Sequence, residues 1–227
     1  GGEEHVFERG LFAAGRRPNV AGLQLQRAGI PVKPHGLPTF DSGTFRLGDA
    51  PVYFVGDVNA SRPILHEASD QGRIAGFNAV RDADQCFRKR TLLGITFSDP
   101  NIAVVGASYA DVVASGVPFV VGKVSYRGQG RAIVKLKEKG ALHVYVADDD
   151  GRLLGAEMIA PDGEHLAHLL SWAMATKLTV FDTLSLPFYH PVVEEGVRTA
   201  LRDAARQVRR SRPDLEVLRC QDPPAGG

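Results

Sequence analysis

The stretch "LHVYVADDDGRLLGAEMI", residues 142–159, places three aspartates and a glycine between two mostly apolar segments. Asp-Gly between two such segments is a strong signal for a β-hairpin, because both residues tolerate the backbone conformations that a tight turn requires. The stretch therefore predicts strands over 142–147 and 153–159, joined by a turn at 148–151. Strands joined in this way run antiparallel.

The pattern on either side of this hairpin extends the same domain. Four further segments have strand character: 94–97, 102–106, 119–126 and 131–136. Around the last of these, Lys135, Lys137 and Lys139 alternate with Leu136 and Glu138, as expected for a strand with one solvent-facing side. Two helices are predicted to close the unit, over about 163–176 and 193–207. Strands followed by helices indicate an α+β domain with an antiparallel sheet.

The N-terminal part has a different organisation. Three segments have strand character: 6–14, 39–45 and 52–55. A short helical turn is expected over 23–28, ending at Gly29. Residues 63–81 carry small and apolar side chains at helical spacing, with Pro63 at the first helical position. We interpret this part as an α/β remnant, separated from the α+β domain by a boundary near residues 82–92, where the polar link 82–90 lies.

Composition narrows the classes of partner. The chain has 227 residues, of which 44% are hydrophobic, which is enough for one or two domains with buried cores. A net charge of +1 and an aromatic content of 7% argue against a nucleic-acid surface. The apolar runs are far shorter than the ~20 residues of a membrane helix. We expect neither nucleic acid nor membrane as a partner.

The cysteine content indicates the compartment. Cys86 and Cys220 are too few for a disulfide scaffold and too far apart in sequence for a CxxC or CxxxxC pair. This content is typical of a reducing compartment, so we expect a cytoplasmic protein.

The segment "VYFVGDVN", residues 52–59, is a candidate ligand site. It is an apolar strand that delivers Gly56 and Asp57 at its carboxyl end, where open α/β sheets bind ligands. Asp57 can accept hydrogen bonds from ligand hydroxyls, and Gly56 permits close backbone approach. The first free N–H groups of the following helix, around residues 64–66, would add a partial positive charge. An ordinary turn is the alternative interpretation.

A second candidate is "FYHPVVEEG", residues 188–196. His190 and Glu195 stand at the start of a predicted helix. They form either a proton-handling pair or a helix whose first turn carries acidic residues, which the helix dipole favours. The residues alone leave both interpretations open.

Two other clusters carry weaker signals. His165 and His168 share a helix with Glu164 but lack a further ligand, so no metal site is predicted. Arginines recur along one face of the last helix and are offset by nearby carboxylates: Arg198, Arg202, Arg206 and Arg209. We interpret that face as solvated or as part of an interface, rather than as an anion site.

Five motifs together resemble one family. They occur in this order: AAGRRPN (13–19), VYFVGDVN (52–59), PILHEASDQGRIAG (63–76), ITFSDPNIAVVG (95–106) and YHPVVEEG (189–196). In this order they resemble the C-terminal half of the flavin-dependent pyridine nucleotide-disulfide oxidoreductases, and among these most of all the dihydrolipoyl dehydrogenases. The resemblance covers about residues 6–205.

The resemblance implies a division of the chain and a mode of assembly. It assigns residues 1–16 to the end of an NAD-binding domain, 17–90 to the C-terminal part of an FAD-binding domain, 91–208 to an interface domain and 209–227 to a tail. Members of the family form homodimers through the interface domain. A homodimer through 91–208 is therefore expected.

The same resemblance implies roles for the cofactor candidates. Gly56 and Asp57 would contact FAD, with Asp57 binding its hydroxyls. The backbone of Ile64, Leu65 and His66 would face the pyrimidine edge of the flavin, where the helix dipole stabilises negative charge. In this interpretation the His66 side chain is equally compatible with a spacer and with a residue that takes part in the chemistry at the flavin.

The resemblance also implies a catalytic pair. His190 would reach the redox disulfide of the other subunit and deprotonate a dithiol substrate, and Glu195 would orient it. The usual His-Pro-Thr of the family is here His190-Pro191-Val192. This departure leaves the substrate open, so a lipoyl domain, a small dithiol or the substrate of a related flavoprotein disulfide reductase are all compatible.

The glycine fingerprints for FAD and NAD and the redox CxxxxC pair belong to the N-terminal half of the family. None occurs in these 227 residues, and the chain begins Gly-Gly-Glu-Glu without methionine. We therefore expect a fragment that binds no cofactor alone, whose full-length parent uses FAD and NAD to oxidise a dithiol. A catalytically inactive dimerisation module is the alternative.

Overall fold

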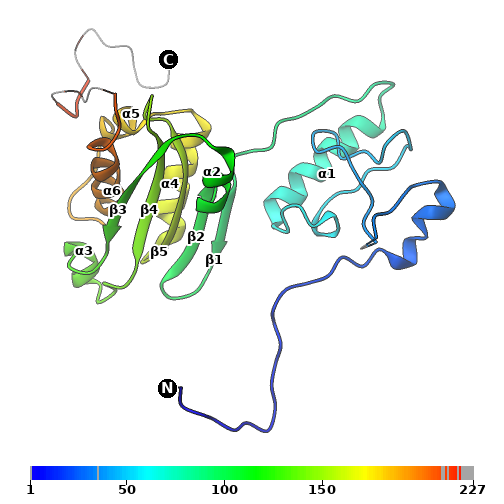
Figure 1. Cartoon of the computed structure of the whole chain (residues 1–227), viewed down its shortest axis with the longest axis horizontal. Coiled ribbons are helices and arrows are strands. Elements are labelled where there is room, and N and C mark those ends of the chain that lie inside the picture. Colours follow the sequence, from blue (N-terminus) through cyan, green and yellow to red (C-terminus); the bar gives the residue numbers. More distant parts are fainter. Residues whose placement is uncertain (1, 35, 211–212, 214, 219, 221–227) are drawn as a thin grey trace. The chain divides into compact units, whose positions relative to one another are not determined.

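The computed structural model describes the chain except for residues 1, 35, 211–212, 214, 219 and 221–227. It divides into two compact units, Gly1–Lys89 and Arg90–Gly227 (Figure 1). In the described part of the chain, every helix is too short or too polar to cross a membrane.

The second unit is built on a five-stranded antiparallel sheet with the order β1-β2-β5-β4-β3. Its strands are β1 (Leu93–Thr96), β2 (Asn101–Gly106), β3 (Phe119–Ser125), β4 (Ala141–Ala147) and β5 (Leu153–Ala160). The hairpin predicted from residues 142–159 is confirmed, with Leu142 opposite Met158 and Val144 opposite Ala156. The α+β class with an antiparallel sheet is also confirmed.

Period-two alternation sends one side of each strand into a common core. On β4, this side carries Leu142, Val144 and Val146, which are fully buried. Helices α4 (Gly163–Ala175) and α6 (Glu195–Ala205) pack on this face, α4 against β2 and β5 and α6 against β3 and β4 (Figure 1). Both were predicted, with ends that differ by one or two residues.

The opposite face of the sheet is partly covered by α2 (Tyr109–Ser115). Tyr145 projects from this side of β4, and its ring lies 5.8 Å from that of Tyr109 and 6.2 Å from that of Phe119. Tyr145 also donates to Glu157, which accepts from the backbone N–H of Tyr109 at 3.0 Å. Burial, and secondarily this hydrogen bond, raise the pKa of the Tyr145 phenol.

The strand expected over 131–136 is wrong. Residues Gly130–Val134 form α3, because the Gln129 side chain accepts from the N–H of Ala132 and caps the helix. Ala132 is fully buried against the core, so tertiary packing overrides the β-branched local sequence. The expected lysine alternation is also wrong, because residues 135–139 form a turn and irregular chain in which every residue is exposed.

Two short helices were not predicted. In α2, Ser108 and Asp111 form a capping box, and in α5 (Val180–Leu184) Thr179 and Asp182 do the same. In each, the hydroxyl and the carboxylate three residues later exchange bonds with each other's backbone N–H. This satisfies N–H groups that a helix start otherwise leaves open.

The first unit contains α1 (Leu65–Ala79) and three short 3-10 helices, η1 (Ala21–Leu23), η2 (Leu25–Ala28) and η3 (Asp57–Asn59). The helix predicted over 63–81 is confirmed, except that Pro63 precedes the N-cap, Ile64. The helical turn ending at Gly29 is also confirmed, and Gly29 has the positive φ of a C-cap.

The three strands expected in the first unit are wrong. Residues 6–14 are irregular and exposed, and the segments around 39–45 and 52–55 take part only in isolated bridges, Val32 with Pro38 and Arg46 with Tyr53. Strand propensity becomes a strand only where a neighbour offers a continuous ladder, and the described residues of this unit offer none.

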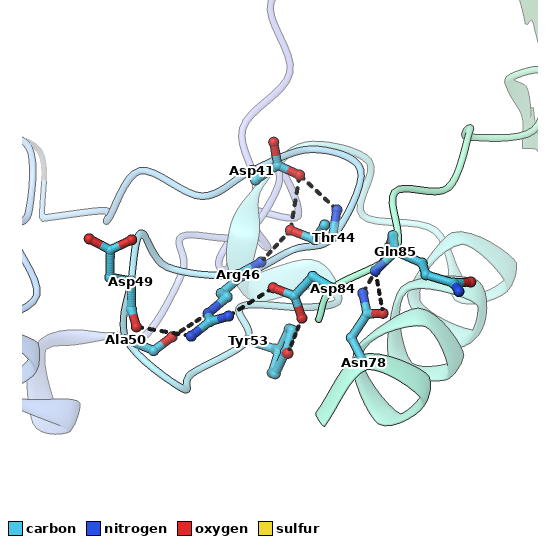
Figure 2. A network of polar contacts seen from close by, with 9 residues as sticks. All are labelled: Asp41, Thr44, Arg46, Asp49, Ala50, Tyr53, Asn78, Asp84 and Gln85. Atoms are coloured by element: carbon cyan, nitrogen blue, oxygen red, sulfur yellow. Dashed lines mark hydrogen bonds and ion pairs between the residues drawn. The ribbon is translucent and has the colours of Figure 1, made fainter. Parts of the chain in front are cut away.

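Polar contacts tie the end of the first unit to its irregular segments (Figure 2). Asp84 accepts from Arg46 Nη1 at 3.0 Å and from the Tyr53 hydroxyl at 2.6 Å. These bonds lower the pKa of Asp84. Asn78, near the end of α1, exchanges two 3.0 Å bonds with the backbone of Gln85. The segment after α1 is thereby fixed to its own unit.

Candidate functional site

His190 and Glu195 are hydrogen-bonded to each other at the start of α6. Nδ1 of His190 lies 3.0 Å from Oε1 and 3.1 Å from Oε2 of Glu195. The imidazole is 80% exposed, whereas the carboxylate is 30% exposed. The carboxylate is therefore the anchored member of the pair, and the ring projects outward.

The protonation of the pair follows from the state of the carboxylate. The hydrogen bond from His190 is the main cause that lowers the pKa of Glu195, with a smaller contribution from the N–H of Val192, whose nitrogen is 3.2 Å from Oε2. An ionised carboxylate only accepts hydrogen bonds, so Nδ1 of His190 must carry the proton. In the neutral ring Nε2 is then left with a free lone pair, which is the atom that could act as a base.

Residues outside the motif hold this loop in place. Gln129 donates from Nε2 to the carbonyl of Val192 at 2.8 Å, and Val193 is buried in the core. A Cβ on Gly196 would lie 2.6–2.7 Å from the ring and hydroxyl of Tyr126, which is fully buried. Glycine at 196 therefore lets α6 approach Tyr126 closely. Sequence reasoning missed Gln129, which lies just before the segment mistaken for a strand, and Tyr126, which was placed at the end of the predicted strand 119–126.

Gly56 and Asp57 lie in a turn that is organised by one buried side chain. Oε1 of Gln71, on α1, accepts from the N–H of Gly56 and from Nδ2 of Asn59, both at 2.7 Å. Gln71 is 1% exposed. Its Nε2 is buried and has no hydrogen-bond partner among the described residues. Sequence reasoning missed Gln71 and Asn59, although both fall within the quoted motifs.

The turn lies beside the first part of α1. A Cβ on Gly56, whose φ is +79°, would be 3.7 Å from the Cβ of Ala68. Asp57 is ion-paired with Arg16. The backbone N–H groups of the first helical turn have no partner within the helix, and Leu65 and His66 expose their side chains there. The predicted cofactor-binding residues of this unit are thus brought together.

The first unit also contains a hollow of about 910 Å³. Its lining includes Phe40, Asp41, Arg46, Asp49 and Asp84. None of the predicted cofactor-binding residues lines it. Arg46 fixes part of its wall by donating from Nε to Ala50 O at 2.9 Å, as Figure 2 shows.

The histidine cluster on α4 has other contacts. His168 Nδ1 lies 2.7 Å from the backbone oxygen of Glu164, and His165 Nε2 lies 4.0 Å from its carboxylate. Among the described residues, no group of three or more His, Cys, Asp or Glu side chains is arranged to hold a metal ion.

The arginine face of α6 binds carboxylates of the same chain. Arg198 and Arg202 both contact Glu216, and Arg209 pairs with Asp148 at 2.7 Å. The expectation of a solvated or interface face did not include these contacts. The tail expected at 209–227 lies largely outside the described residues.

Comparison with known sequences gives a family and several relatives. Residues 93–201 match the pyridine nucleotide-disulphide oxidoreductase dimerisation domain. Dihydrolipoyl dehydrogenase of Haloferax volcanii is 30% identical over 209 residues, which are 91% of this chain and 44% of that protein. Soluble pyridine nucleotide transhydrogenase of Mycobacterium tuberculosis is 26% identical over 208 residues, again 44% of its length. The chain thus spans less than half the length of these relatives.

Solved structures share the fold. The HOCl-induced flavoprotein disulfide reductase RclA from Escherichia coli matches with a TM-score of 0.70 and 23% identity, over 85% of this chain and 43% of that one. LpdA from Mycobacterium tuberculosis matches with a TM-score of 0.70 and 26% identity, over 84% of this chain and 41% of that one.

Proposed function

Since residues 93–201 match the pyridine nucleotide-disulphide oxidoreductase dimerisation domain, we propose that the chain is the C-terminal part of a dihydrolipoyl dehydrogenase-like enzyme. In this proposal the whole protein is a homodimeric flavoprotein that oxidises a dithiol and reduces NAD. The dithiol is a small molecule or a lipoyl group on a carrier domain. The observation that carries the proposal is the His190–Glu195 pair.

The pair supplies the proton chemistry that dithiol oxidation requires. A thiol with a pKa near ~8.5 is mostly protonated at neutral pH, so a base must remove its proton before sulfur can attack. Nε2 of His190 takes that proton, while Glu195 holds Nδ1–H and stabilises the imidazolium.

The substrate loses two electrons when its two thiols form a disulfide. The substrate thiolate attacks a redox disulfide in the part of the enzyme that precedes this chain, and one sulfur of that disulfide leaves as a thiolate. The second substrate thiol closes the product disulfide and leaves the enzyme's cysteine pair reduced. FAD, when bound, would pass these two electrons to NAD.

The first unit fits one side of an FAD site. The exposed first turn of α1 offers N–H groups that have no partner within the helix, and the Gly56 turn lies beside it, whereas the N–H of Ile64 donates to the carbonyl of Arg62 at 2.8 Å. In this proposal the backbone of Ile64, Leu65 and His66 faces the flavin and Asp57 binds its hydroxyls. Asp57 would exchange its pairing with Arg16 for those hydroxyls.

The second unit supplies the dimer contact, through residues 91–208. Leu169 and Trp172 are 42% and 67% exposed and lie three residues apart on α4, so they share one face. A large exposed aromatic beside an aliphatic side chain is typical of an interface. A two-fold contact would use the same patch on both subunits.

The decisive test separates two half-reactions of the whole enzyme. His190→Gln should reduce dithiol oxidation by about 10²- to 10⁴-fold, the usual cost of losing a general base. Hydride exchange between NADH and flavin needs no thiol base and should survive. Glu194→Gln is the matched control, since it removes a neighbouring carboxylate that does not contact the imidazole, and it should change neither rate. Parallel loss of both half-reactions in a folded His190→Gln dimer would refute the base.

Transhydrogenation is a second candidate, because one relative carries that name. Hydride transfer between two nicotinamide nucleotides involves no dithiol, so a transhydrogenase would keep its activity in His190→Gln. A catalytically inactive dimerisation module is the third possibility. A flavin absorption band in the purified 227-residue chain would contradict it, and we expect no such band.

We place the protein in the cytoplasm. Both cysteines, Cys86 and Cys220, are free and exposed, which fits a reducing compartment. Detection of the protein in an oxidising compartment, with these cysteines disulfide-bonded, would overturn this assignment.

A further inference from the structure

A carboxylate beyond the family domain is bound to α6 close to the His190–Glu195 pair. Glu216 accepts from Nε of Arg202 at 2.8 and 2.9 Å and from Nη2 of Arg202 at 2.6 Å. It also accepts from Nη2 of Arg198 at 3.2 Å. Only 15% of the Glu216 side chain is exposed. Two guanidinium groups therefore hold one largely buried carboxylate.

Arg198 is the link between Glu216 and the pair. It follows Glu195 by three residues on α6, and residues at this spacing are neighbours on a helix surface, about 5–6 Å apart at Cβ. A glutamate and an arginine so placed commonly form an ion pair. In this chain Arg198 instead binds Glu216, and the Glu195 carboxylate binds His190 and the N–H of Val192.

Arg198 has the capacity to bind a second carboxylate. Its Nε is buried and has no hydrogen-bond partner among the described residues. Its guanidinium carbon lies 5.7 Å from the centre of the Phe188 ring, at the start of the loop that carries His190. A guanidinium offers a carboxylate two parallel, charge-assisted bonds, which is more than an imidazole N–H provides.

We propose that Glu216 is a positioning residue for His190, because it engages Arg198 and thereby leaves the Glu195 carboxylate to hold Nδ1–H of the imidazole. Its catalytic consequence rests on the proposed function, whereas the positioning is a property of this chain. Loss of the Glu216 charge frees Arg198, which then turns to Glu195 and displaces His190.

The tautomer of His190 reports this competition directly. In ¹⁵N-histidine-labelled 227-residue chain, long-range ¹H–¹⁵N spectra give the ratio of Nδ1–H to Nε2–H forms of the neutral ring, with His190→Gln to assign the signals. Glu216→Gln should lower this ratio by about two- to fivefold, the range expected for an exposed charged pair. Glu4→Gln, the same charge change in the exposed N-terminal segment, should leave it unchanged.

A double substitution separates competition from simple support of the helix. Arg198→Gln combined with Glu216→Gln should restore the wild-type ratio, because the competing guanidinium is gone. Arg198→Gln alone should leave the ratio at its wild-type value. The proposal is overturned if Glu216→Gln does not change the ratio, if the double variant stays as low as the single, or if Arg198→Gln alone lowers it.

These measurements use neither flavin nor substrate. Their failure would remove the role of Glu216 and leave His190 as the proposed base. If instead the half-reaction test on His190→Gln failed, His190 would be removed as the proposed base and the positioning role of Glu216 would remain.

Discussion

Substitution of Gly122 tests the close contact between β3 and α6. Gly122 lies in β3, and a Cβ added there would be 2.1 Å from the carbonyl oxygen of Ala200 and 2.7 Å from the Cβ of Ala204, both on α6. Real Cβ contacts stay above 3.0 Å, so β3 and α6 must separate by about 0.9 Å. The obstacle is mainly backbone, and no side-chain rotation removes it.

The expected cost is large for one methyl group. A gap of 0.5–1 Å already forfeits about a quarter to a half of the dispersion attraction between the surfaces that it opens. The face of α6 that would lose these contacts carries Val197, Ala200, Leu201 and Ala204, all at most 2% exposed. Overpacking of this kind costs about 1–3 kcal/mol, and we expect Gly122→Ala near ~3 kcal/mol because the neighbour is rigid.

Urea unfolding of the 227-residue chain measures this cost. Trp172, the only tryptophan, lies on α4 and reports on the same unit. Gly130→Ala is the matched control, because a Cβ there meets nothing within 4 Å, and it should stay within about 0.5 kcal/mol of wild type. Adding Ala204→Gly to Gly122→Ala should recover only part of the loss, since the clash with the Ala200 oxygen remains. A Gly122→Ala chain as stable as the control would refute the packing of α6 on β3.

Three further outcomes are expected. Thr179→Ala removes the cap of α5 and should cost about 1 kcal/mol in urea unfolding followed by Trp172 fluorescence. Gln71→Leu removes the acceptor for the N–H of Gly56 and for one N–H of the Asn59 amide, and should cost about 1–3 kcal/mol in the first unit, measured by hydrogen exchange on α1. The folded pKa values of Glu195 and Glu216 are lowered, so their stabilisation is present above about pH 4.5 and is lost as pH falls through the folded values. Substituting both by glutamine should flatten the acid limb of the stability profile, and an unchanged limb would contradict these contacts.

The second unit was largely predictable because its signals are local and agree with one another. The Asp-Gly turn and the alternation around it set the β4–β5 pairing, with Val144 opposite Ala156. The N-terminal caps of α2 and α5 are also visible in the sequence. Ser108 with Asp111 and Thr179 with Asp182 each match the capping-box pattern, although the helices that follow are only seven and five residues long.

The misassigned segments are those where a partner decides the structure. Residues 131–136 have the β-branched composition of a strand, yet the Gln129 cap and the burial of Ala132 make them begin as a helix. Residues 52–55 are equally strand-like and make only a bridge, Arg46 with Tyr53. Neither outcome follows from local composition, because each depends on which surface the segment meets.

The His190–Glu195 pair shows how far motif reasoning extends into a site. The five-residue spacing is visible in the sequence, and the helix start explains why a carboxylate is stable at 195. The hydrogen bond itself depends on the Gln129 contact that fixes Val192, and on the close approach of Tyr126 to Gly196. It also depends on whether Arg198 binds Glu216 or Glu195, and Glu216 lies outside the family motif. The segment beyond the motif therefore affects how the imidazole is held. In a chain that kept His190 and Glu195 but lost Glu216, both residues of the pair would be present, but the hydrogen bond between them would be weaker.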